Sequence, residues 1–253
     1  MKKWMLVFSL IQGLVIAGLG MQAQAGDITE KLEMAMKSDI RGEADTKRDR
    51  NRKAKETLAF FGLEDDMKVV ELIPGGGWYT KLLGQVLAED GQLHVAFGTG
   101  NVEKNLLTKP GFEQVKVAGT KAKMYRPEGA RLYTLEKTDL GLKNQDIVFT
   151  FRNYHNFDEA GRMAMNKAAH KALKKGGTYA LVDHTRRHMQ GDDGENRRRF
   201  DPVLAIKEIQ ASGFELVDYS DLHYRPDDEL LYEVGRRTVT GNTDRWTLKF
   251  KKI

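Results

Sequence analysis

Apolar and polar positions along the chain follow two patterns that alternate with each other. Short apolar runs, typical of buried strands, are found at MKVVELI, GQLHVAF, QDIVFTF and TYALVDH, which are residues 67–73, 91–97, 145–151 and 178–184. Between these runs lie longer stretches whose apolar residues recur at helical spacing. Strands alternating with helices predict a parallel sheet with helices on both faces.

After the first of these apolar runs, four stretches have the pattern of helices. Residues 78–89 (WYTKLLGQVLAE) place several apolar side chains on one side, namely Tyr79, Leu82, Leu83, Val86 and Leu87. Residues 101–107 predict a short helix, and residues 158–177 a longer one closed by Gly176 and Gly177. Residues 201–213 predict a helix with Pro202 in its first turn.

The end of the chain lacks this alternation. FELVDYS (214–220) reads as a strand, and DRWTLKFKK (244–252) places Trp246, Leu248 and Phe250 at every second position, which is the period of a strand. No helical pattern separates the two, so we expect them to pair antiparallel. FEQVKVA (112–118) and ARLYTLE (130–136) are weaker extended stretches.

The beginning of the chain has the pattern of a secretory signal peptide. Lys2 and Lys3 precede an uncharged apolar run, and Ala23-Gln24-Ala25 supplies the small residues of a cleavage site. The alternative is an uncleaved anchor, although the run is short for a membrane span of about 20 residues. We therefore predict a signal peptide over residues 1–25 and a periplasmic or secreted protein. We expect no stable membrane insertion after cleavage.

Residues 26–253 then form the mature chain, which we expect to be a single domain. Its first part, about residues 27–62, predicts a helical extension, with a second helix from about Thr46 to Phe61 that Asp45 or Thr46 can cap. The formal charge falls from +5 to +3 with the loss of Lys2 and Lys3, and the remaining excess is spread along the chain. This argues against a nucleic-acid partner. The chain has no cysteine, which excludes thiolate chemistry.

Three polar clusters follow predicted strands. They are the glycine turn Gly75–Gly77, the run Arg152–Asn156, and the pair Asp183 and His184. In open parallel sheets, ligands bind at the carboxyl ends of the strands. The glycine turn lacks the Gly-Lys-Ser/Thr of a triphosphate cradle and the G-x-G-x-x-G spacing of a nicotinamide fingerprint. A tight turn that binds nothing is the alternative.

Together, these blocks resemble a family of exported methyltransferases that use S-adenosylmethionine. RDRNRKAKETLAFFGL, ELIPGGGWYT, DIVFTFRNYHNF, LKKGGTYALVDH and TDRWTLKFKK stand in that family's order over nearly the whole mature chain. The resemblance implies an α/β fold with a Rossmann-like, seven-stranded sheet, mostly parallel, whose last strand is antiparallel. Where most such enzymes have a first glycine after the first strand, this chain has Ile73 followed by Pro74.

The resemblance also implies a cofactor site for S-adenosylmethionine. The expected contacts are Glu71 near the ammonium group and a set around the turns, namely Pro74, Gly75, Gly76, Gly77, Tyr79, Thr99 and Glu136. The acid that usually holds the ribose is missing, because HVAFGTGN offers Gly98, Thr99 and Asn101 there. Glu136 or Asp139 is the candidate for the adenine amino group.

Candidate catalytic residues are Arg152, Asn153 and His155 in FRNYHN. Imidazole titrates near neutrality, so His155 is the candidate base; Arg152 can hold an anionic acceptor, and Asn153 can orient it. Alternatively, Arg152 and Asn153 only fix the loop. Asp183 and His184 can complete the acid–base set. A metal at His184 and His188 would need a further ligand that nothing nearby compels, so we expect no metal.

The sequence thus predicts an exported methyltransferase acting on a small molecule. Two alternatives remain open. One is a binding protein that keeps the fold without catalysis, and the other is an enzyme, such as a lyase or hydrolase, that uses the fold for another reaction. The sequence does not fix the acceptor or the oligomeric state.

Overall fold

The computed structural model describes residues 19–253, of which residues 19–27 are described only as helical backbone. Residues 1–18, which hold most of the expected signal peptide, lie outside the described part. Four helices precede the first strand: α1 (Leu19–Lys37), α2 (Glu43–Thr46), α3 (Asp49–Arg52) and α4 (Ala54–Phe61). None of the helices within residues 19–253 has the length and apolar character needed to cross a membrane.

The single helix expected from Thr46 to Phe61 is wrong, because the chain breaks it twice. Lys53 takes a left-handed conformation (φ 43°) between α3 and α4. The carbonyl of Arg52 accepts hydrogen bonds from Thr57 Oγ1 and from the Tyr79 hydroxyl, at 3.0 and 3.3 Å. Contacts with distant parts of the chain therefore override a helix-favouring local sequence.

Seven strands among the described residues form one sheet in the order β3-β2-β1-β6-β7-β9-β8. In chain order, the first four strands of this sheet are β1 (Lys68–Leu72), β2 (Gln92–Ala96), β3 (Lys116–Ala118) and β6 (Gln145–Phe151). The last three are β7 (Leu173–His184), β8 (Phe214–Ser220) and β9 (Arg245–Lys252). The pairs from β3 to β7 are parallel, whereas β9 is antiparallel to both of its neighbours. This confirms the predicted sheet and its antiparallel last strand.

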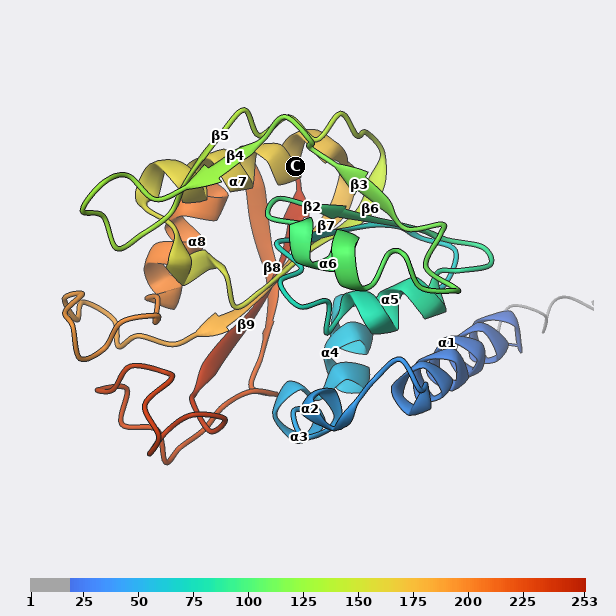
Figure 1. Ribbon diagram of the computed structural model, residues 1–253, viewed down its shortest axis with the longest axis horizontal. Helices are drawn as coiled ribbons and strands as arrows, with labels where there is room; N and C mark the ends of the chain where they lie inside the picture. Colours follow the sequence, from blue (N-terminus) through green and yellow to red (C-terminus); the bar gives the residue numbers. More distant parts are fainter. Residues whose placement is uncertain (1–18) are drawn as a thin grey trace, which may run out of the picture.

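Helices cover both faces of this sheet, with α7 (Glu159–Ala172) and α8 (Pro202–Gln210) on one face and α5 (Thr80–Val86) with α1 and α4 on the other (Figure 1). The short α6 (Gly100–Asn105) follows β2. Asp158 and Asp201 cap α7 and α8, each accepting a backbone N–H of its helix's first turn. The layers match the arrangement expected from the sequence.

One sequence-based expectation needs correction here. Helix α7 ends at Ala172, before Gly176 and Gly177, because Leu173 already pairs with Gln145 in the sheet. The stretch 130–136 is extended in part, as expected: it contributes β5 (Thr134–Glu136), which pairs with β4 (Lys123–Tyr125) in a separate two-stranded sheet. Strand pairing, which local patterns do not encode, decides where α7 ends.

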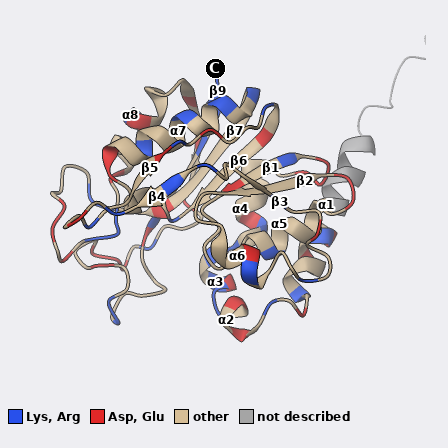
Figure 2. Ribbon diagram, turned by 45° about the horizontal axis from the view of Figure 1, so that its top comes forward, with Lys and Arg blue, Asp and Glu red and all other residues tan. Residues whose placement is uncertain are grey.

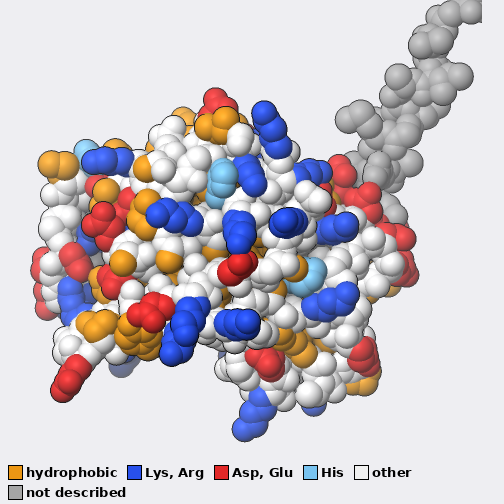
Figure 3. All heavy atoms as spheres, turned by 90° about the horizontal axis from the view of Figure 1, so that it is seen from above, with side chains coloured by type: hydrophobic (Ala, Val, Ile, Leu, Met, Phe, Trp, Pro, Cys, Tyr) orange, Lys and Arg blue, Asp and Glu red, His pale blue; other side chains and the backbone are white. Residues whose placement is uncertain are grey.

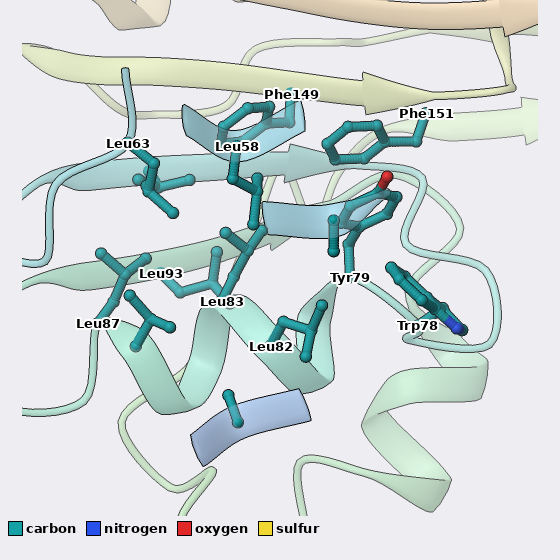
Figure 4. Packing of buried hydrophobic residues seen from close by; sticks show 14 of the residues in the cluster. Leu58, Leu63, Trp78, Tyr79, Leu82, Leu83, Leu87, Leu93, Phe149 and Phe151 are labelled. Carbon is teal, nitrogen blue, oxygen red and sulfur yellow. The ribbon is translucent and has the colours of Figure 1, made fainter. Parts of the chain in front are cut away.

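Alternate residues of the central strands feed two apolar cores. Val69, Phe149 and Phe151 face α1, α4 and α5, whereas Val70 and Val148 face α7 and α8. In the first core, the Tyr79 ring stacks on Phe151 with ring centroids 3.6 Å apart, beside the leucines of α5 (Figure 4). The period-2 alternation of a strand buried on both faces explains this division.

Charged residues of both signs are distributed over helices and loops along the ribbon (Figure 2). On the face seen from above, several Lys and Arg side chains lie across the middle, with acidic and apolar side chains among and around them (Figure 3).

Candidate functional site

The carboxyl ends of β1, β2, β6 and β7 lie along one edge of the sheet, as expected for neighbouring parallel strands. The chain leaves three of these strands in the same way. Ile73 after β1, Phe97 after β2 and Arg152 after β6 all have a positive φ, of 56°, 63° and 61°. Side chains with a Cβ rarely adopt this conformation, and such strain is found preferentially at functional sites. A first glycine at position 73 would avoid the strain.

The glycine turn follows β1 and has two different parts. Gly75 and Gly76 are exposed, and no atom lies within 4 Å of where their Cβ atoms would be. Gly77 instead packs on α6, where a Cβ would lie 2.9 Å from Leu106. The carbonyl of Pro74 closes the turn by accepting from the N–H of Gly77 at 2.9 Å. Only Gly75 and Gly76 therefore present open backbone to an approaching ligand.

Glu71, near the end of β1, is buried. Its carboxylate accepts a hydrogen bond from the Thr80 hydroxyl at 2.6 Å. Burial raises the pKa of Glu71 to about 7, against the smaller opposing effects of the Thr80 hydrogen bond and the Arg52 charge. Glu71 thus changes charge near neutral pH directly beneath the glycine turn.

The Tyr79 side chain lies in the apolar core rather than on the open side of the turn. Its ring stacks on Phe151, and its hydroxyl donates to the carbonyl of Arg52. Burial also raises its pKa. Packing is therefore sufficient to explain this residue.

The end of β2 carries an acid that sequence reasoning missed. The Thr99 hydroxyl donates to Oε1 of Glu103 at 2.5 Å, so the Glu103 carboxylate lies beside one of the residues that follow β2. Glu103 lies four residues later on α6, at the i, i+4 spacing that brings two side chains together on one face of a helix. Glu136 lies on the exposed hairpin β4–β5, where the Tyr125 hydroxyl donates to it at 2.5 Å.

His155 and Asp183 form a buried pair at the ends of β6 and β7. Nδ1 of His155 lies 2.5 Å from Oδ1 of Asp183, and the His155 backbone N–H donates to Oδ2 of Asp183 at 3.0 Å. Within residues 19–253, Nε2 of His155 has no hydrogen-bond partner, and His155 lines a cavity of about 340 Å³. An imidazole oriented in this way can accept a proton at Nε2.

His184 lies beside this pair, with ring centroids 5.6 Å apart. Its Nδ1 is 2.9 Å from the Thr243 hydroxyl. Burial first, and then the neighbouring charges, hold the pKa of His184 well below its ordinary value. His184 is therefore a neutral neighbour rather than a second charged group.

Arg152 and Asn153 have different surroundings. The Asn153 side-chain amide donates to the carbonyls of Ile73 and Phe151, which ties the end of β6 to the glycine turn. The Arg152 side chain lines the 340 Å³ cavity, and its buried Nε has no hydrogen-bond partner in the described part of the chain. The loop-fixing alternative thus accounts for the contacts of Asn153 but leaves the Arg152 side chain unexplained.

The cavity also contains arginines that the sequence did not single out. Arg52 comes from α3 and Arg245 from the start of β9, nearly the whole chain apart. Arg52 lies over the Trp78 ring, 4.3 Å from its centroid, and so links α3 to the residue after the glycine turn. No local pattern in RDRNRK or DRW distinguishes these arginines from solvated ones.

Metal ligands do not gather here: within the described residues no three His, Cys, Asp or Glu side chains form a group that could hold a metal ion. His184 and His188 do not share a helix, and Nδ1 of His188 lies 2.9 Å from Asp201 rather than near His184.

Comparison with protein-family models and with curated protein sequences finds no match. Comparison with solved structures does. A SAM-dependent methyltransferase from Aquifex aeolicus is similar at a TM-score of 0.55 and 14% identity, over 89% of this chain and 98% of that one. The glycopeptide N-methyltransferase MtfA in complex with S-adenosyl-L-methionine is similar at 0.51 and 15%, over 80% and 94%.

A third similar structure is the [4+2]-cyclase SpnF, with a TM-score of 0.55 and 13% identity over 90% of this chain and 94% of that one. At such identities the likeness establishes the fold alone. The chain therefore has the fold of class I S-adenosylmethionine-dependent methyltransferases, a fold that the [4+2]-cyclase SpnF shares.

Proposed function

We propose that this protein is a methyltransferase that uses S-adenosylmethionine and acts on a small-molecule acceptor. The observation that carries the proposal is the open backbone of Gly75 and Gly76 on the same sheet edge as His155. Fold similarity supports the cofactor class, and the His155–Asp183 pair supports catalysis rather than binding alone.

The residues at the ends of β1 and β2 suit the donor. Open backbone at Gly75 and Gly76 would receive its methionine part, and Glu71 would face the ammonium group. Glu103, together with Thr99, would accept hydrogen bonds from the ribose hydroxyls, which are stronger when the acceptor is charged. S-adenosylmethionine supplies a methyl group already activated on its sulfonium sulfur.

The residues at the ends of β6 and β7 suit the acceptor. His155 would take the acceptor's proton at Nε2, while Asp183 holds the ring and stabilises the imidazolium that forms. Arg152 would hold an anionic part of the acceptor. Asn153 would position the loop through its hydrogen bond to Ile73.

Calorimetry with S-adenosylmethionine and S-adenosylhomocysteine tests the proposal. Wild type should bind both, and Gly76→Val should weaken binding at least tenfold, which is about 1.4 kcal/mol. Gly76 has an ordinary φ and open space at its Cβ, so this variant should still fold. Gly194→Val is the matched control, because Gly194 is also exposed and open but lies in the loop before α8. A folded wild type that binds neither compound at millimolar concentration would defeat the proposal.

A reaction other than methylation is the second candidate, and the similarity to the cyclase SpnF favours it. A protein that binds S-adenosylmethionine and transforms an acceptor without releasing S-adenosylhomocysteine would establish it. Binding without any turnover would indicate the remaining alternative, a binding protein.

We further propose that the protein is exported and cleaved after Ala25, without nucleic-acid partners. Lys2, Lys3 and the uncharged run that follows them support this. Mass spectrometry of protein from the host should find a mature chain that starts at Gly26. An intact Met1 end in the cytoplasmic fraction would contradict export.

A further inference from the structure

The 340 Å³ cavity beside His155 is lined by an excess of positive side chains. Five arginines contribute to it, namely Arg48, Arg52, Arg152, Arg198 and Arg245, together with His155 and His184. No Asp or Glu is among the lining residues in the described part of the chain. Asp183 stands behind His155 and is 1% exposed, so it does not face the cavity.

Three of these arginines are poorly compensated by the protein. Arg52 and Arg245 are only 6% and 7% exposed, and with Arg152 each has a buried Nε without a hydrogen-bond partner. Within residues 28–253, no carboxylate forms an ion pair with Arg52, Arg152 or Arg245. Arg52 contacts the ring faces of Trp78 and Tyr79, and Nη1 of Arg245 donates to the carbonyl of Asn51 at 2.5 Å.

Burial among like charges lowers the pKa values of these three arginines. Burial, followed by repulsion from Arg152, lowers the pKa of Arg52 to about 8 and that of Arg245 to about 10. Burial and the Arg48 charge lower the pKa of Arg152 as well. Buried like charges destabilise the folded protein unless an opposite charge joins them.

In a second, neighbouring cavity, most arginines form ion pairs with carboxylates. The cavity of about 550 Å³ that also has His155 in its lining contains many arginines as well, but carboxylates pair with most of them. Arg162 pairs with Glu208 at 2.7 Å, Arg199 with Asp228 at 2.8 Å, and Arg131 with Asp192 at 2.8 Å. The missing carboxylates are therefore a property of the smaller cavity.

We infer that the smaller cavity binds a phosphate-type oxyanion of the acceptor, held by Arg52, Arg152 and Arg245. Guanidinium groups match the oxygens of phosphate with parallel hydrogen bonds. A group with more than one negative charge compensates three cations better than a single carboxylate does. The volume admits the anion together with the part of the acceptor that would lie against His155.

The same chemistry has a second source, the carboxylate of the methyl donor. The lining favours the acceptor, because no residue from Ile73 to Gly77 contributes to the described cavity. Assigning the anion to the acceptor rests on the proposed methyltransferase function. Binding of the oxyanion itself does not, so the two can be tested separately.

Calorimetry with inorganic phosphate and with pyrophosphate is the direct test. Wild type should bind at least one of them, and Arg52→Gln and Arg152→Gln should each weaken that binding at least tenfold. Arg197→Gln is the matched control, because Arg197 is exposed and lines only the larger cavity. Without ligand, Arg152→Gln should melt no lower than wild type, since it removes an unpaired charge. Equal weakening in the control variant, or no binding of either anion at millimolar concentration, would overturn the inference.

Binding of S-adenosylhomocysteine separates the two sources. If the cavity serves the acceptor, phosphate and S-adenosylhomocysteine should bind together, and Arg152→Gln should leave binding of the latter nearly unchanged. Competition between the two, with both lost in Arg152→Gln, would assign the arginines to the donor carboxylate and overturn the acceptor assignment. Phosphate binding in a protein that does not bind S-adenosylhomocysteine would defeat the proposed function and leave the oxyanion site standing.

Discussion

Nδ1 of His155 lies 2.5 Å from a carboxylate oxygen of Asp183, and both side chains are almost completely shielded from solvent. His155 follows β6 and Asp183 is near the end of β7, so parallel pairing of these strands creates the contact. The carboxylate also accepts the backbone N–H groups of His155 and His184. The pair therefore fixes the orientation of the imidazole and leaves Nε2 directed at the cavity side.

The first prediction concerns the tautomer of this imidazole. An ionised carboxylate accepts hydrogen bonds but cannot donate one. Beside ionised Asp183, neutral His155 should therefore carry its proton on Nδ1 and leave Nε2 free to accept a hydrogen bond. In Asp183→Asn, the side-chain amide can donate to Nδ1, so the proton should move to Nε2. Nitrogen-15 NMR of the histidine rings distinguishes the two forms. Thr243→Val, which removes the partner of His184, should leave the His155 signals in place. A wild-type proton on Nε2 would refute the proposed orientation.

The second prediction concerns turnover. His155→Ala should reduce the rate by about 10²–10⁴-fold, the usual contribution of a general base, with folding and donor binding nearly intact. Release of S-adenosylhomocysteine, measured with phosphate-bearing acceptors, gives the rate. His188→Ala is the control, since His188 contacts Asp201 and does not line the cavity. Wild-type turnover in a well-folded His155→Ala protein would leave positioning as the only contribution of this cluster.

The third prediction concerns Glu71, whose pKa burial raises from 4.5 to about 7. An acid with a raised folded-state pKa contributes most to stability below about pH 4.5, and this contribution is lost as the pH rises through about 7. The full loss is about 3 kcal/mol, from about 1.4 kcal/mol per pKa unit. Between about pH 5 and about pH 8, wild type should lose up to this amount of unfolding free energy. Glu71→Gln, which cannot titrate at this position, should not show this loss.

Urea denaturation of both proteins across this range measures the shift. Glu128→Gln, at an exposed position, is the control and should follow wild type. Parallel curves for wild type and Glu71→Gln would show that Glu71 does not titrate within the range.

The fourth prediction contrasts paired and unpaired arginines. Arg199 forms two hydrogen bonds to Asp228, at 2.8 and 2.9 Å, and both side chains are buried. Arg199→Met should therefore lower stability by about 3–5 kcal/mol, because it leaves a buried carboxylate without its cation. Arg152→Gln should not have this effect. Equal losses in the two variants, measured by urea denaturation, would mean that Arg152 has a structural partner.

Much of the fold is encoded locally, because strand and helix periods reflect which side chains can be buried together. Val69 and Val70 in one apolar run indicate a strand covered on both faces, and Asp201 with Pro202 marks the start of a helix. The strand ends then locate Gly75, Arg152 and Asp183 at one edge, since neighbouring parallel strands point the same way. The fold class and the position of these residues at one sheet edge thus follow from the sequence.

The partners within that edge were decided by the tertiary structure. Arg52 and Arg245 line the same cavity although almost the whole chain separates them. Lys53 interrupts a helix-favouring sequence because the neighbouring Arg52 is held by residues after the glycine turn. The Arg52 carbonyl accepts from the Tyr79 hydroxyl, and the Arg52 guanidinium lies over the Trp78 ring. Local periodicity determines how most segments fold, with the stretch around Lys53 as an exception. Long-range packing determines which charges come together, and hence what the cavity can bind.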